Sequence, residues 1–120
     1  MTRTQQFWFE GLDAYRVARE ALASGIRLRE RFRGLPGELA SQLERALLST
    51  VANIAEGAGR SSKADRARHY AIARGSANEA GAIVEIAVLY GVLDESEHAE
   101  LRGALVRTAQ LLTGLMRASR

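Results

Sequence analysis

The stretch Asn53-Ile54-Ala55-Glu56-Gly57-Ala58-Gly59-Arg60 brings polar side chains and two glycines to the end of an apolar helical segment. The segment before it carries apolar residues at steps of three and four positions, and these are Leu39, Leu43, Leu47, Val51 and Ile54. That period predicts an amphipathic helix over about 38–56, and Gly57 is a natural C-terminal stop. Helical spacing, rather than strand alternation, therefore decides the fold class.

Further helices are predicted on either side of this one, over about 12–32, 63–90 and 95–117. The first has the stripe Leu12, Tyr15, Ala18, Leu22 and Ile26, and the last has the stripe Leu101, Leu105, Thr108, Leu112 and Leu115. Ser62 and Asp94 are predicted N-caps. Short connections favour antiparallel neighbours, so we expect an all-α, antiparallel up-down-up-down four-helix bundle, as a single domain over 1–120.

The composition excludes several classes of protein. The chain has 120 residues, a net charge of +3 and no cysteine, so it has neither disulfides nor thiolate metal sites. No apolar run approaches the ~18 residues of a membrane span, and the N-terminus shows no secretory signal. We therefore expect a soluble cytoplasmic protein that does not bind a membrane.

A polar stripe runs along the helix predicted over 38–56. Its members are three or four positions apart and share one face: Gln42, Arg45, Ser49, Asn53 and Glu56. Two interpretations stay open. The stripe is either a solvated face or buried polar ladder that fixes helix register, or it is a contact with another subunit or with nucleic acid.

Two motifs resemble ligand sites without completing them. The turn 57–63 precedes a helix N-terminus, where backbone N–H groups attract anions, but it lacks the spacing of a phosphate loop. Glu95 and His98 have the i,i+3 spacing of a di-metal bundle motif, of which the chain has only one copy. We therefore predict no metal, no cofactor and no catalytic residue.

Gly75 and Ser76 lie inside the third predicted helix, where small residues allow a close approach of another helix, and Glu79 follows one turn later. Glu79 is either an exposed charge or the partner of an arginine across a subunit interface. The aromatic run 7–9 is either a plug over one end of the bundle or an arm that reaches a neighbouring subunit. A weak basic face on the first helix offers phosphate contacts, through Arg16, Arg19, Arg27, Arg29, Arg31 and Arg33.

In the motifs described above, the chain resembles the bacterial family of ribosomal RNA intervening-sequence proteins. That family includes the accessory variability protein of diversity-generating retroelements. The resemblance covers about 9–115, and its most specific part combines the block 53–60 with Gly75 and Ser76. The other matching residues are Phe9, Leu12, Tyr15, Ala18, Pro36, Glu38, Leu39, Gln42, Leu43, Arg45, Ala46, Ser49, Ile72, Ala73 and Glu79.

The resemblance implies an all-helical, non-enzymatic protein. Members similar to the retroelement accessory protein are basic homopentamers that bind nucleic acid and a reverse transcriptase. In this sequence Glu44 stands where a second basic residue beside Arg45 is common, which lowers the positive charge.

Two functions of different classes follow. The first is an oligomeric accessory or scaffold protein, a pentamer by resemblance, with phosphate contacts to RNA or DNA and a partner such as a reverse transcriptase. Its subunit contacts or motif region would be Gln42, Arg45, Ser49, Asn53, Glu56, Gly57, Arg60, Gly75, Ser76 and Glu79. The alternative is a purely protein-binding helical adaptor with no nucleic-acid affinity.

Overall fold

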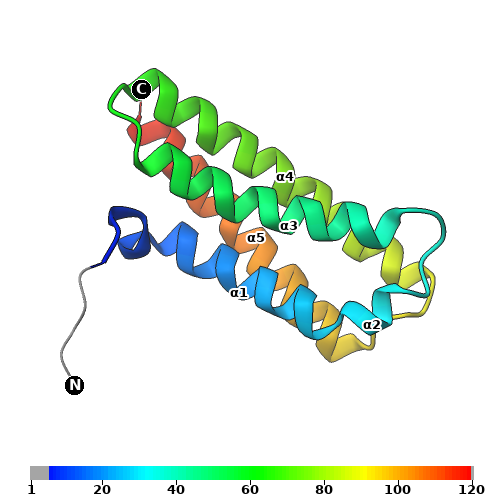
Figure 1. Cartoon of the computed structure of the whole chain (residues 1–120). Coiled ribbons are helices and arrows are strands. Elements are labelled where there is room, and N and C mark those ends of the chain that lie inside the picture. Colours follow the sequence, from blue (N-terminus) through cyan, green and yellow to red (C-terminus); the bar gives the residue numbers. More distant parts are fainter. Residues whose placement is uncertain (1–5, 120) are drawn as a thin grey trace.

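The structure is a computed structural model that describes residues 6–119. Its regular elements are all helical, which confirms the predicted all-α class (Figure 1). The long helices are α1 (Asp13–Arg27), α3 (Leu39–Ala58), α4 (Lys63–Leu89) and α5 (Glu95–Ala118). A short 3-10 helix, η1 (Trp8–Gly11), precedes α1, and one further helical turn, α2 (Arg29–Phe32), follows it.

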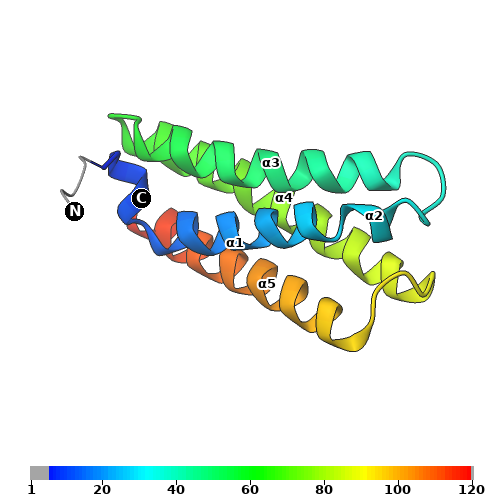
Figure 2. The ribbon, with the colours of Figure 1, turned by 60° about the horizontal axis from the view of Figure 1, so that its bottom comes forward.

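The four long helices alternate in direction along the chain, and Figures 1 and 2 show them side by side. Helix α3 packs against α4, α4 against α5, α5 against α1, and α1 against α3. This is the order of neighbours expected of an antiparallel bundle with short connections. None of the helices within residues 6–119 combines the length and apolarity needed to cross a membrane.

The first helix is interrupted where the sequence predicts a continuous one over 12–32. Helix α1 ends at Arg27, and Leu28 has φ −94° and ψ 8°, outside the helical range. The short α2 follows at an offset, so that Phe32 and then Leu35 are buried over the end of the core. Periodicity continues through the break, which is why the sequence does not reveal it.

The interior of α1 consists of small side chains: Ala14, Ala18 and Ala21 are each 1–2% exposed. The predicted stripe is therefore partly wrong. Tyr15 and Leu22 pack at the flanks of the core, while Ile26 is 49% exposed. Small residues permit a close approach of α1 to its neighbours, and larger ones fill the spaces beside it.

The predicted stripes of α3 and α5 form most of the remaining core. Leu43, Leu47 and Ile54 of α3 are buried, as are the α5 residues Leu101, Leu105, Thr108 and Leu112. The apolar C-terminal end of α4 is partly exposed, at Val88 and Leu89. Ser62 caps α4, and Asp94 with Glu97 forms a capping box on α5, as the sequence predicts.

Gly57 does not stop α3, contrary to the prediction, because the helix continues to Ala58. Its role is to let α4 approach. A Cβ at this position would lie 2.9 Å from Cε1 of Tyr70, closer than real Cβ contacts come, and 3.0 Å from Cβ of His69, which is also very tight. Tyr70 is 3% exposed, so its ring has little room to move. Burial also raises the pKa of its phenol, although the charge of Arg66 opposes that shift.

We expect Gly57→Ala to destabilise the fold by about 1–3 kcal/mol, because the added methyl group overpacks the contact with Tyr70. Gly103→Ala is the matched control: Gly103 lies inside α5, and a Cβ there would meet no atom within 4 Å. It should gain up to about 1 kcal/mol from helix propensity. Urea denaturation measures both, and an unchanged Gly57→Ala variant would show that α4 can move away.

Candidate functional site

A seam of hydrogen-bonded side chains joins α3 to α4 along the predicted polar stripe. The hydroxyls of Ser49 and Ser76 are 2.8 Å apart and share a hydrogen bond. The Asn53 side-chain amide donates to the Ser49 carbonyl at 3.0 Å and to its hydroxyl at 3.2 Å. The seam therefore contains Ser49, Asn53 and Ser76 of the predicted motif, and it favours the polar-ladder interpretation at these positions.

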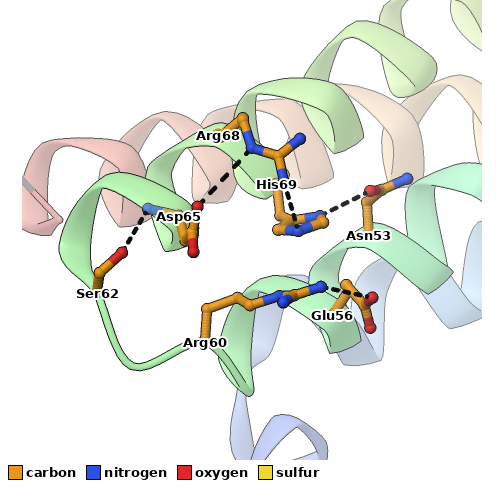
Figure 3. Close-up of polar contacts among 7 residues, drawn as sticks. All are labelled: Asn53, Glu56, Arg60, Ser62, Asp65, Arg68 and His69. Atoms are coloured by element: carbon orange, nitrogen blue, oxygen red, sulfur yellow. Dashed lines mark hydrogen bonds and ion pairs between the residues drawn. The ribbon is translucent and has the colours of Figure 1, made fainter.

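His69 extends the seam from the α4 side and is 7% exposed. Its Nδ1 lies 3.1 Å from Oδ1 of Asn53, and its Nε2 lies 3.3 Å from a guanidinium nitrogen of Arg68 (Figure 3). Arginine only donates, so Nε2 accepts and the ring proton sits on Nδ1, where it donates to Asn53. With the proton on Nδ1, both ring nitrogens have a hydrogen-bond partner.

The sequence does not reveal the place of His69 in the seam, because its partner Asn53 lies sixteen positions away on another helix. The available signal was the antiparallel register of α3 and α4, which places both residues near the shared turn. The polar groups of the seam are hydrogen-bonded to one another. The seam therefore joins two helices rather than presenting a reactive group.

The turn after α3 is held by its own side chains. Arg60 pairs with Glu56 at 3.0 Å (Figure 3). The Arg66 guanidinium donates to the backbone carbonyls of Arg60 and Ser61. The Ser62 hydroxyl accepts from the backbone N–H of Asp65 at 3.0 Å. These contacts favour the capped-turn interpretation over the phosphate loop, because the Ser62 hydroxyl already occupies one of the N–H groups that an anion would use.

Other predicted motif residues remain outside the seam. Gln42 is half-buried, while Arg45 and Glu79 are exposed and make no ion pair within residues 6–119. Gly75 is also exposed, and a Cβ there would meet no atom within 4 Å. The expectation that Gly75 allows close packing is therefore wrong for contacts within one chain.

Five of the six predicted phosphate-contacting arginines face carboxylates. The pairs are Arg16 with Asp13, Arg27 with Glu100 at 2.5 Å, Arg29 with Glu44 at 2.5 Å, Arg31 with Glu97 at 3.0 Å and Arg33 with Glu30 at 3.2 Å. Arg19 makes no ion pair among the residues described. Hydrogen bonds from Ser24 and Arg27, with the charge of Arg27, lower the pKa of Glu100.

The i,i+3 spacing pairs His98 with Glu95, but in the structure His98 contacts a carboxylate of another helix. Its Nε2 lies 2.5 Å from Glu85 of α4, and Arg102 approaches the other oxygen of the same carboxylate. Residues 6–119 contain no group of three carboxylate, histidine or cysteine side chains placed to hold a metal ion. Glu85, His98 and Arg102 thus form a contact between α4 and α5.

The helices and the seam define an all-α protein whose helices α3 and α4 are joined by polar side chains. A family model matches residues 10–114, and the chain belongs to the 23S rRNA-intervening sequence protein family. This confirms the resemblance that the sequence motifs indicate. The family's description names no reaction, and no protein among the curated ones matches the chain.

A solved structure supports the same fold. It is a protein of unknown function from the S23 ribosomal protein family of Bacteroides thetaiotaomicron, 21% identical to this chain, with a TM-score of 0.71. The match covers 84% of this chain and 98% of that one. At this identity the likeness concerns the fold.

We expect Asn53→Ala to lower the free energy of unfolding by about 1–3 kcal/mol, because it leaves the buried Nδ1–H of His69 without an acceptor. Asn78→Ala is the control, since Asn78 is exposed on α4. It should change stability by less than about 0.5 kcal/mol. Equal denaturation midpoints for the two variants would contradict a structural role for the seam.

Proposed function

We propose that this protein is a non-catalytic scaffold that works as a homo-oligomer. One subunit contact is the outer face of α3 and α4, here called the α3–α4 face. It consists of six exposed residues with the same spacing on the two helices: Arg45, Leu48 and Ala52 on α3, and Ile72, Gly75 and Glu79 on α4. The seam lies next to it, since Ser49 and Ser76 are sequence neighbours of Leu48 and Gly75.

Gly75 is the observation that carries the proposal. A glycine inside a helix costs about 0.5–1 kcal/mol relative to alanine. Among residues 6–119 of one chain nothing requires this glycine, because a Cβ would meet open space. A second copy that approaches the helix backbone closely would require it.

Gly75 lies between exposed apolar side chains of two helices. Leu48 is 49% exposed and Ile72 is 41% exposed, so the α3–α4 face presents apolar area around a small residue. Arg45 and Glu79 provide charged groups at its edge. An apolar centre with a charged edge is the usual composition of a subunit contact.

Family membership supports a scaffold rather than an enzyme, because neither the family nor the solved relative carries the name of a reaction. By the resemblance described above, we propose a pentamer as the assembly. A reverse transcriptase is the proposed protein partner on the same ground.

Light scattering across a range of protein concentrations tests the scaffold proposal. Wild type should exceed the 13.1 kDa of one chain, and Gly75→Arg should reduce the mass while keeping the helical spectrum. Gly103→Arg is the matched control, because Gly103 is equally open but lies on α5. A wild-type protein that stays a single chain at high concentration would favour the adaptor instead.

Nucleic-acid binding is a second candidate function. The observation in its favour is that four exposed arginines, at 27, 29, 31 and 33, follow one another around the end of α1. Each of them faces a carboxylate, so a phosphate must compete with that carboxylate for the guanidinium. We therefore propose weak phosphate contacts without sequence recognition.

Fluorescence anisotropy with labelled RNA and DNA, at several salt concentrations, tests this second function. We expect weak affinity that falls steeply as salt rises, because phosphate contacts release counterions. Arg29→Ala with Arg31→Ala should reduce the slope of affinity against salt, while Arg117→Ala, on α5, serves as the control. No binding at low salt would eliminate this function and leave the scaffold proposal intact.

A further inference from the structure

An apolar cleft lies between α1, α2 and the first half of α3, with a volume of about 210 Å³. Leu22, Phe32, Leu43 and Leu47 contribute to its walls, and Ile26, 49% exposed, stands beside them. Gly25 allows Leu47 of α3 to contact the backbone of α1, because a Cβ at this position would lie 2.4 Å from Cδ1 of Leu47. The cleft is a feature of the break between α1 and α2.

The polar side chains that line the cleft are a carboxylate, a hydroxyl and two guanidinium groups. Arg29 donates twice to Oε1 of Glu44, at 3.0 and 2.5 Å, which leaves Oε2 free of the contacts made by Arg29. Ser41 and Arg33 also line the cleft. An occupant would thus meet apolar walls, oxygen acceptors and guanidinium groups that can stack on an aromatic ring.

The N-terminal end of the chain presents exposed aromatic side chains on a fixed base. Phe9 packs edge-on against Tyr15 of α1 with ring centroids 4.8 Å apart, and Phe7 stacks on Phe9 at 5.3 Å. Trp8, on η1, is 76% exposed, and Phe7 is 69% exposed. The protein thus leaves a large apolar ring in water next to an anchored one.

Building on the proposed scaffold function, we infer that Trp8 of one copy inserts into the cleft of a second copy. The sizes agree, since an apolar cavity of about 150 Å³ already accepts a benzene ring. An indole is apolar apart from one N–H donor, and Glu44 and Ser41 supply acceptors.

Trp8 cannot reach the cleft of its own chain. Helix α1 separates η1 from the cleft, and at 1.5 Å per residue its 15 residues span roughly 20 Å. Figures 1 and 2 show η1 and α2 at opposite ends of α1. Because this contact joins different surfaces of two copies, it can be repeated from each copy to the next. The copies form a closed ring when the rotation between neighbours divides a full turn evenly.

The fluorescence of Trp8, the one tryptophan of the chain, tests the inference directly. In the assembled protein we expect blue-shifted emission and several-fold weaker quenching by acrylamide than in the dissociated protein. Ile26→Arg, in the cleft, should restore quenching and raise the dissociation constant roughly tenfold or more, as expected for an interface anchor. Val106→Arg is the control, since Val106 is 42% exposed on α5 and lies outside the cleft.

Light scattering on the same samples separates this inference from the proposed scaffold function. If Trp8 is quenched equally in assembled and dissociated protein, the cleft contact is wrong while the scaffold proposal stands. If wild type never assembles, both are wrong. Circular dichroism of Ile26→Arg checks that the variant folds, and Trp8→Ala provides a second variant, which should weaken assembly without changing the cleft.

Discussion

The close approach of α3 and α4 is the constraint on which the rest of the structure depends. Gly57 allows the ring of Tyr70 to lie against the backbone of α3, and the hydrogen bond from His69 to Asn53 fixes the register at the same level. Moving either helix by one residue would bury the imidazole without its acceptor, at a cost of about 1–3 kcal/mol. This contact sets the relative position of α3 and α4, against which α1 and α5 pack.

Glycines in this chain serve two different purposes, and the structure separates them. Gly57 and Gly25 are needed inside one copy, because a Cβ would collide with Tyr70 or Leu47. Gly75 meets no neighbour and lies among exposed apolar residues. Gly75 lowers the helical stability of α4, and a contact with another chain at this position would offset that loss.

Local periodicity explains how much of the fold the sequence predicts. The stripes of α3 and α5 and the caps at Ser62 and Asp94 depend on residues within a few positions, so the sequence contains them. The break at Leu28 and the pairing of Asn53 with His69 depend on packing between distant segments. The spacing of Ser49 and Asn53 correctly places them on one face of α3, but no spacing rule identifies what they meet.

Pairing of the exposed arginines with carboxylates has an electrostatic consequence for the whole molecule. At physiological ionic strength, charges separated by more than about 8 Å are largely screened from one another. A distant polyanion would therefore sense paired charges around the end of α1 rather than a cluster of free cations there. Long-range steering should be weak, and the arginines become available only after an encounter at short range has exchanged their partners.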